Sequence, residues 1–479
     1  MRVAIVDLGK TNAKVALVDT DRAEEIAVRS TPVSPRADGP YPHLDVGALR
    51  AAIVDALAGL AREGPIDAIG VCAHGATVAL LDGAGELALP VLDYEHDGPD
   101  ELADEYDAAR PAFAESGSPR LPGGLNVGAQ LLWQERRFAD AFARVRSIVT
   151  WPQYWAHLLC GVACSELSSL GAHTDLLDVR SMCPSSLAVA RGWDRRLAPT
   201  RRPGKRLGPV RADVARATGL SPGTPVHVGI HDSNASLVPH LLGAERPLSV
   251  VSSGTWTIAM ALGGRAVELD PVRDTLVNVD AFGDAVPSAR FMGGRERELL
   301  SRSGAGRSGT GGADASRAEE GGAERAPSAM RRVLERGAFV LPGAVAGCGP
   351  WPGRETPEWS VDEATLDDDE HAAAIGLALG LVAATCLELA GADGPTVIEG
   401  PMAADPAATA MLRAATGREV RAGGGATGTA VGTGMTIAVP ADAGGAAPRP
   451  VAESGMPVEA LERYARRWRE AIGDGTGRA

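Results

Sequence analysis

Short apolar runs separated by polar turns open the chain and set the first expectation about its fold. Residues 3–6 are apolar and largely β-branched and predict a buried strand, and residues 15–18 repeat that character after a polar turn. Two such runs around a tight turn predict a hairpin. Apolar positions over residues 48–62 recur at helical spacing, and residues 68–73 again predict a buried strand. This alternation of strands and helices is typical of an α/β fold.

A similar opening recurs near the middle of the chain. Residues 248–251 predict a second apolar strand, and residues 252–257 form a polar loop that contains Gly and Thr, as the first loop does. Because both halves begin in this way, we predict a duplicated two-domain α/β protein. The domains are expected at residues 1–244 and 245–479.

Three segments of the second half have a distinct composition. Residues 301–328 are rich in Ser, Gly and Ala with mixed charges and predict a flexible insertion. Residues 372–387 carry no charge, but sixteen residues at ~1.5 Å each are too short for a ~30 Å hydrocarbon core, so they predict a buried helix. A terminal helix is expected over residues 458–472.

Composition and charge narrow the classes of function. The 479 residues carry 47 Lys+Arg and 61 Asp+Glu, a net charge of -14, which disfavours binding to nucleic acid or to anionic membranes through a basic surface. The six cysteines form no metal-binding or disulfide pattern and are expected to be small buried residues. Two of the three lysines, Lys10 and Lys14, lie in the first predicted loop.

The first loop, residues 7–14, has the donors of an anion site. It is not a Walker A loop, because that motif needs a Gly where Ala4 stands and a helix after the lysine. Its backbone N–H groups could instead form a concave anion site, and Asp7 could hold a hydrated Mg²⁺. An ordinary polar hairpin is the alternative. The loop at residues 252–255 has the same donor-rich character, so a polyphosphate could lie between the two.

A third candidate follows the predicted strand at residues 226–230, which ends at His231 and Asp232. A helix is expected over residues 234–242. An Asp at that point is often a helix cap. The functional alternative is a general base that deprotonates a substrate hydroxyl.

Together these motifs, in this order, resemble the FGGY carbohydrate kinases, in a form similar to the rhamnulose and fuculose kinases. Residues 7–14 look like the first phosphate loop of that family, residues 252–257 like the second, and residues 229–232 like the segment with the catalytic aspartate. Residues 397–402 and 426–434 look like the adenosine-binding end. The resemblance implies two actin-like, ribonuclease H-like domains with a central cleft.

The resemblance also implies a role for each matching residue. Asp232 would be the general base, and Asp7 and Asp232 would position Mg²⁺. Gly400 would lie beside the adenosine of ATP. The residues expected at the ATP phosphates are Lys10, Thr11, Asn12, Lys14, Gly254 and Thr255. Those expected at the sugar are His74, Gly75, Glu95, Gln153, His173 and His231.

The chain departs from the family pattern at three places. Many relatives have Thr where this chain has Lys10, and a triple-glycine turn where it has residues 399–401. The sugar motif Trp-x-Asp-x-Arg is replaced by residues 92–95, Leu-Asp-Tyr-Glu. These departures bear on the phosphate contacts, the seat of the adenine and the identity of the sugar.

The sequence therefore predicts a cytoplasmic ATP- and Mg²⁺-dependent kinase of a small sugar or polyol. A deoxy-ketose such as L-fuculose or L-rhamnulose is the expected substrate, and a homodimer is left open. A non-catalytic actin-like assembly protein or sugar sensor is the alternative, although it would not need the carboxylate of Asp232. A dinucleotide enzyme is disfavoured because no Gly-x-Gly-x-x-Gly follows the first strand.

Overall fold

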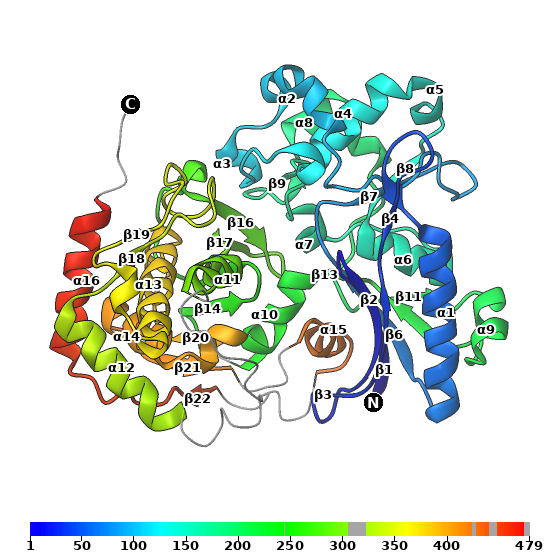
Figure 1. Cartoon of the computed structure of the whole chain (residues 1–479). Helices are drawn as coiled ribbons and strands as arrows, with labels where there is room; N and C mark the ends of the chain where they lie inside the picture. Colours follow the sequence, from blue (N-terminus) through cyan, green and yellow to red (C-terminus); the bar gives the residue numbers. More distant parts are fainter. Residues whose placement is uncertain (244, 305–321, 424–427, 440–447, 474–479) are drawn as a thin grey trace. The chain divides into compact units, whose positions relative to one another are not determined.

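The computed structural model describes residues 1–243, 245–304, 322–423, 428–439 and 448–473, and the chain divides into two compact units (Figure 1). Unit 1 comprises Met1–Ala244, Val277–Ala285 and Gly425–Gly445. Unit 2 comprises Glu245–Leu276, Val286–Gly424 and Ala446–Ala479. The main break in the chain therefore follows Ala244, and two later segments of the chain return to unit 1.

Unit 1 is built on a sheet with the strand order β11-β12-β6-β1-β2-β3, and β13 also pairs with β6. Strand β1 is antiparallel to β2 and parallel to β6. The strands are β1 (Arg2–Leu8), β2 (Asn12–Asp19), β3 (Glu24–Pro32), β6 (Ala68–Ala73), β11 (Arg206–Pro209), β12 (Pro225–His227) and β13 (Ile230–His231).

Helices cover both faces of this sheet. Val3 and Ile5 of β1 belong to a core that includes residues of α10 (Asp232–Gly243) and α15 (Thr429–Ile437). The alternate residues Ala4, Val6 and Leu8 belong to a second core that includes residues of α1 (Val46–Glu63) and α9 (Ala212–Thr218). A strand that is buried on both faces is apolar at every position, and the apolar run of residues 3–6 predicted such a strand for this reason.

Residues 78–200 of unit 1 contain several short helices and a second, aromatic-rich core, which includes Tyr106, Trp133 and Trp193. The two-stranded sheets of unit 1 are β4 (Pro35–Arg36) with β5 (His43–Leu44), β7 (Val78–Leu81) with β8 (Ser147–Thr150), and β9 (Leu177–Asp178) with β10 (Cys183–Pro184). The helices of this region are α2 (Ala103–Ala109), α3 (Phe113–Ser116), α4 (Val127–Arg137), α5 (Ala139–Phe142), α6 (Trp151–Cys160), α7 (Leu167–Leu170) and α8 (Ser186–Ala190).

Unit 2 repeats the topology of the first sheet. Its strand order is β16-β17-β15-β14-β20-β21-β22. Strand β14 is antiparallel to β15 and parallel to β20, as β1 is to β2 and β6. The strands are β14 (Leu248–Ser253), β15 (Thr257–Leu262), β16 (Thr275–Val279), β17 (Ala285–Phe291), β20 (Thr396–Glu399), β21 (Val420–Ala422), β22 (Arg449–Pro450), and the pair β18 (Val340–Leu341) and β19 (Glu358–Trp359).

The core of unit 2 lies around helix α13 (Asp368–Leu389), in which residues 373–384 are all buried. Asp367 and Glu370 form a capping box at its start. The other helices are α11 (Gly293–Gly304), α12 (Gly322–Arg336), α14 (Pro406–Thr416) and α16 (Val458–Ile472). The two matching sheets confirm the predicted duplicated α/β fold.

Several expectations can now be compared with the structure. Residues 372–387 lie in α13, the one described helix long and apolar enough to span a membrane, and 78% of its most apolar window is buried within the protein. The segment expected as an insertion, residues 301–328, is helical at both ends, in α11 and α12, and residues 305–321 lie outside the described residues. The prediction of buried cysteines holds for Cys72, Cys164 and Cys386, while Cys160 and Cys348 are half-buried. It is wrong for Cys183, which is exposed at the β9–β10 hairpin.

Candidate functional site

Three of the predicted motifs meet at one edge of the sheet of unit 1. Leu8 of β1 and His231 of β13 both pair with Ala73 of β6 in parallel register. Strands β1, β6 and β13 therefore end at the same level of the sheet. The first loop follows β1, residues 74–77 follow β6, and α10 follows β13. Ligand sites of open α/β sheets lie at such carboxyl ends of parallel strands.

The first loop is a tight turn in which Gly9 donates to the Asn12 carbonyl at 3.0 Å. Thr11 and Asn12 are exposed at its tip. Asp7, by contrast, is buried below the loop and accepts a 2.5 Å hydrogen bond from Thr429 of α15. Burial raises the pKa of Asp7, against the opposing effects of Thr429 and Lys14.

Lys14 lies between two carboxylates of unit 1. Its ammonium is 3.4 Å from Asp7 and 3.1 Å from Glu25. Burial works against the charged form of Lys14, but the two carboxylates outweigh it and raise its pKa. The ammonium therefore remains charged beside the first loop.

Lys10 points from the first loop toward residues 93–95, which replace the sugar motif of the relatives. Its ammonium pairs with Asp93, lies 3.3 Å from Glu95, and sits 4.4 Å from the centre of the Tyr94 ring. The Glu95 side chain is 65% exposed. The structure thus brings Lys10 and Glu95 together, although the sequence assigned one to phosphate and the other to sugar.

His74 and Gly75 follow β6. The Nδ1–H of His74 donates to the Gly75 carbonyl at 2.9 Å, so Nε2 is left as an acceptor in the neutral ring. Burial lowers the pKa of His74, and nearby Lys10 and His231 act in the same direction. Gly75 is needed for close packing, because a Cβ there would lie 3.0 Å from the Ala172 methyl group.

Asp232 begins α10, and its side chain is 25% exposed. One carboxylate oxygen accepts from the Ser233 N–H at 2.6 Å, a bond to the next residue and not the bond to the second or third helical N–H that a cap residue makes. His231 lies 3.3 Å from the same oxygen. Burial lowers the pKa of His231, while the charge of Asp232 raises it in part.

Two further residues expected at the sugar make hydrogen bonds to the backbone of unit 1. Gln153 is fully buried, donates to the Gly229 carbonyl at 2.9 Å and accepts from Thr150, so its amide supports the strand that leads to His231. His173 is in the loop after α7 with φ of 58°, and its carbonyl accepts from Val127. These contacts hold the backbone of unit 1 together.

The second loop and Gly400 come together in the same way in unit 2. Ser252 of β14 pairs in parallel register with Glu399 of β20, so the chain enters the second loop and Gly400 at one sheet edge. Gly254 and Thr255 are exposed in this loop. Gly400 has φ of 75°, and a Cβ there would fall on the carbonyl oxygen of Ser253.

Sequence reasoning missed the partners of these residues. Thr429 was placed with the adenosine-binding end of the second domain, whereas the structure assigns it to unit 1, where it bonds Asp7. Asp93 belongs to the segment that replaces the sugar motif, and the sequence pattern predicts no partner for it. Both contacts join residues far apart in the sequence, and no local pattern signals such contacts. The neighbouring residues 424–427 lie outside the described residues.

Whether this region can bind a metal ion depends on the oxygen ligands that its side chains offer. No group of three or more His, Cys, Asp and Glu side chains with metal-binding geometry occurs among the described residues. Asp7 and Asp232 do fit a hydrated Mg²⁺, which usually takes one or two carboxylates and keeps its remaining ligands as waters and phosphates. The charge of Asp232 raises the pKa of Asp7, so the two carboxylates interact.

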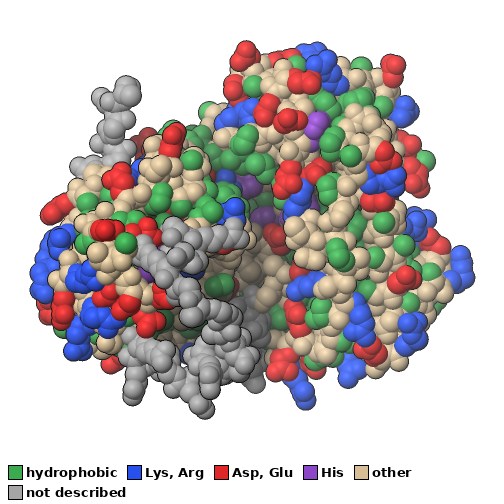
Figure 2. Space-filling view, viewed as in Figure 1, with side chains coloured by type: hydrophobic (Ala, Val, Ile, Leu, Met, Phe, Trp, Pro, Cys, Tyr) green, Lys and Arg blue, Asp and Glu red, His purple; other side chains and the backbone are tan. Residues whose placement is uncertain are grey.

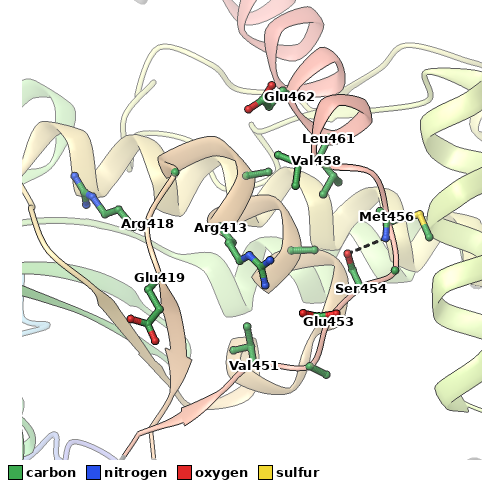
Figure 3. Close-up of a pocket in the computed structure, with 15 residues that line it drawn as sticks. Arg413, Arg418, Glu419, Val451, Glu453, Ser454, Met456, Val458, Leu461 and Glu462 are labelled. Atoms are coloured by element: carbon green, nitrogen blue, oxygen red, sulfur yellow. Dashed lines mark hydrogen bonds between the residues drawn. The ribbon is translucent and has the colours of Figure 1, made fainter.

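A separate pocket of about 430 Å³ lies in unit 2, between the end of α14, the start of α16 and residues 451–456 (Figure 3). Arg413 points into it, and Glu453 and Glu462 also line it. None of the predicted site residues lines this pocket. Figure 2 shows Lys and Arg interspersed with Asp and Glu over the visible surface, with no continuous basic patch among the described residues.

Comparison with known families and proteins finds matches to both halves of the chain. The N-terminal domain model of the FGGY family of carbohydrate kinases matches residues 2–239, and the model of a carbohydrate kinase FGGY C-terminal domain matches residues 245–446. L-fuculokinase of Salmonella typhi is 25% identical over 276 residues, which cover 55% of this chain and 57% of that protein. L-fuculokinase of Escherichia coli K12 is 27% identical over 215 residues, 43% of each chain. The chain thus matches only about half the length of these curated relatives.

Solved structures extend the likeness to the whole chain. A carbohydrate kinase from Novosphingobium aromaticivorans has a TM-score of 0.85 and 34% identity, covering 99% of this chain and 98% of that one. Glycerol kinase of Plasmodium falciparum, solved with ADP, has the same fold with a TM-score of 0.80 and 11% identity, covering 100% and 99%. With both domain models matched and a full-length structural relative, the chain belongs to the FGGY family of carbohydrate kinases.

Proposed function

We propose that this protein transfers a phosphoryl group from ATP to a hydroxyl of a small sugar, with Asp232 as the general base. The observation that carries the proposal is the position of Asp232. Its carboxylate lies at the carboxyl edge of the unit 1 sheet, a quarter exposed, beside the segments that hold the first loop and His74. A base must be open to its substrate and held in place, and Asp232 meets both conditions.

The proposed sugar is a deoxy-ketose such as L-fuculose or L-rhamnulose. The two curated relatives reported above are L-fuculokinases. The second loop, residues 252–257, and the segment of His231 and Asp232 resemble the rhamnulose and fuculose kinases. Nε2 of His74 is an open acceptor for a sugar hydroxyl, and Glu95 offers a second, exposed acceptor. Gly75 and His173 complete this proposed group, and Gln153 supports it from the buried side through its bond to the Gly229 carbonyl.

The proposed nucleotide is ATP with Mg²⁺. Thr11, Asn12, Lys10 and Lys14 would contact its phosphates from the first loop. Gly254 and Thr255 would do so from the second, and Gly400 would lie beside the adenosine. The solved glycerol kinase of the same fold carries ADP. When bound, Mg²⁺ would neutralise phosphate charge, and Asp7 and Asp232 would orient its waters.

The side chains of the protein then have few roles in the reaction. Phosphoryl transfer depends mainly on positioning and on neutralising charge. Asp232 takes the proton of the sugar hydroxyl. At the same time the hydroxyl oxygen bonds to the γ-phosphorus, and the bond from that phosphorus to the ADP oxygen breaks. The ammonium groups of Lys10 and Lys14 offset the charge of the polyphosphate.

An ADP-release assay over a panel of ketoses, aldoses and polyols tests the proposal. Release that depends on a deoxy-ketose, with formation of the sugar phosphate confirmed by mass spectrometry, is the expected result. Asp232→Asn should lower kcat by about 100-fold or more, the contribution typical of a general base, while ADP binding measured by calorimetry stays unchanged. Unchanged turnover would reject Asp232 as the base. A non-catalytic sensor would bind sugar and nucleotide and release no ADP.

A further inference from the structure

The two oxygens of the Asp232 carboxylate have unequal surroundings. Oδ1 accepts from the Ser233 N–H at 2.6 Å and from the Ser233 hydroxyl at 3.2 Å, and it lies 3.3 Å from Nε2 of His231. Oδ2 has no hydrogen-bond partner among the described residues. Because each accepted hydrogen bond draws electron density from its oxygen, Oδ2 is the better proton acceptor of the two.

The ring of His231 is held in one tautomer by Asn234. Nδ1 of the ring lies 2.8 Å from Nδ2 of Asn234, an amide nitrogen that can only donate. Nδ1 must therefore present its lone pair, and in the neutral ring the proton is on Nε2. Nε2 itself lies 3.3 Å from Oδ1 of Asp232. Nδ1 is thus bonded to Asn234, and Nε2 lies next to the carboxylate.

The position of the ring is fixed from the backbone side as well. The His231 N–H donates to the Ser168 hydroxyl at 3.3 Å, and that hydroxyl donates to the buried carboxylate of Glu166 at 2.8 Å. Gly75 packs against the ring, since a Cβ there would lie 3.1 Å from Nε2. The imidazole therefore has little freedom to turn away from Asp232.

We infer that His231 is a positioning residue that, with its proton held on Nε2 by Asn234, pins Oδ1 of Asp232 and leaves Oδ2 to take the proton of the substrate hydroxyl. The inference rests on the proposed function, because it assumes that Asp232 is the base. It differs from the sequence expectation, in which His231 itself contacts the sugar.

The kinetic test compares two substitutions of the histidine. Glutamine can place an amide donor near the position of Nε2, and leucine cannot. His231→Leu should lower kcat by about 10- to 100-fold, the usual cost of losing an orienting partner, with the KM for ATP unchanged. His231→Gln should recover kcat to within a few-fold of the wild type. A glutamine variant as impaired as the leucine variant, with both folded by thermal melting, would overturn the inference.

The second arm changes Asn234. Asn234→Asp keeps the shape but can only accept at that position, so it moves the ring proton to Nδ1 or adds a second one. It should lower kcat about 10-fold in the wild-type background and have little effect in the His231→Gln background. An equal loss in both backgrounds would show that Asn234 acts on something other than the tautomer, and would overturn the inference.

A spectroscopic measurement separates this inference from the proposed function. Long-range ¹H–¹⁵N correlation spectra of the full chain, assigned by loss of the His231 signals in His231→Gln, report which ring nitrogen carries the proton. The wild type should show the proton on Nε2, and Asn234→Asp should change that pattern. A proton on Nδ1 in the wild type would refute the inference even in an active kinase. If no sugar is phosphorylated, the proposed function fails and the assumed role of Asp232 fails with it, whatever the tautomer.

Discussion

Lys10 illustrates at the scale of one residue how the site differs from the sequence pattern of its relatives. Its ammonium is bound to Asp93 and Glu95 and lies over the Tyr94 ring, while its backbone belongs to the first loop. These carboxylates stand in the segment that replaces the relatives' Trp-x-Asp-x-Arg motif. A contact with phosphate therefore requires the ammonium to exchange partners when ATP binds.

Lys10→Met tests that exchange by separating the two KM values. If Lys10 meets the ATP phosphates, as proposed, the variant should raise the KM for ATP about 10-fold, equivalent to ~1.4 kcal/mol, and change the KM for sugar less. Steady-state ADP release with each substrate varied in turn measures both values. Lys205→Met, at the exposed third lysine, is the matched control and should change neither. A rise confined to the KM for sugar would assign Lys10 to the sugar instead.

At the scale of elements, the strands that carry the site were readable from sequence because they are buried on both faces. Residues 3–6, 68–73 and 248–251 are all apolar runs and all proved to be central strands. Strand β3 was missed because it is mostly exposed and polar at the outer end of its sheet, so it lacks an apolar signal. The edge strand β16 was missed as well.

The candidate site divides in the same way. Its loops follow strongly apolar strands and could be found from the local pattern, and the start of α10 at Asp232 was expected within two residues. The residues that contact these loops could not be predicted, because Asp93 meets Lys10 and Thr429 meets Asp7 across 83 and 422 positions of sequence. Such pairs depend on tertiary packing, which a single sequence does not display.

The turn after β20 allows a prediction about backbone fit. Gly400 combines φ of 75° with a Cβ direction blocked by the Ser253 carbonyl, and Ser253 in turn donates to the Glu399 carbonyl at 2.5 Å. Gly400→Ala should therefore lower the free energy of unfolding by about 2 to 4 kcal/mol. Urea unfolding followed by circular dichroism measures the loss.

Gly417→Ala is the control for that substitution. Gly417 ends α14 with φ of 65°, but a Cβ there would meet nothing within 4 Å. Gly417→Ala should lower the free energy of unfolding only by the strain of the left-handed backbone, about 1 kcal/mol. Equal losses for the two variants would show that the contact with Ser253 contributes nothing to the stability of unit 2.

At the scale of the whole molecule, buried carboxyl groups set part of the pH dependence of stability. Burial raises the pKa values of Asp7, Glu166 and Asp175 above their ordinary values. For each, the folded state binds a proton more readily than the unfolded state, so its contribution is fully present below the ordinary pKa and is lost as pH rises through the raised one. Glu166 is the clearest case, because serine N–H and O–H groups surround it and only partly offset its burial.

Glu166→Gln isolates this effect because glutamine does not titrate. The stability of the wild type relative to the variant should fall as pH rises from the ordinary glutamate value near 4.5. Urea unfolding of both proteins from pH 4 to 8 gives the difference at each pH. A constant difference would mean that Glu166 has the same pKa in the folded and unfolded chain. A difference that grows in favour of the wild type would mean that its pKa is lowered on folding.

Helix α15 has a consequence for the order in which the protein is made. It packs on β1 and α10, and its Thr429 bonds Asp7, yet it follows α10 by nearly two hundred residues. At ~5–20 residues per second, the ribosome needs roughly 10 to 40 s to cover that interval. Throughout that time the apolar face that Ala235 and Val238 share with Val431 and Met435 lacks its cover. The first domain to leave the ribosome is therefore the one that must wait for the second to be translated before its fold is complete.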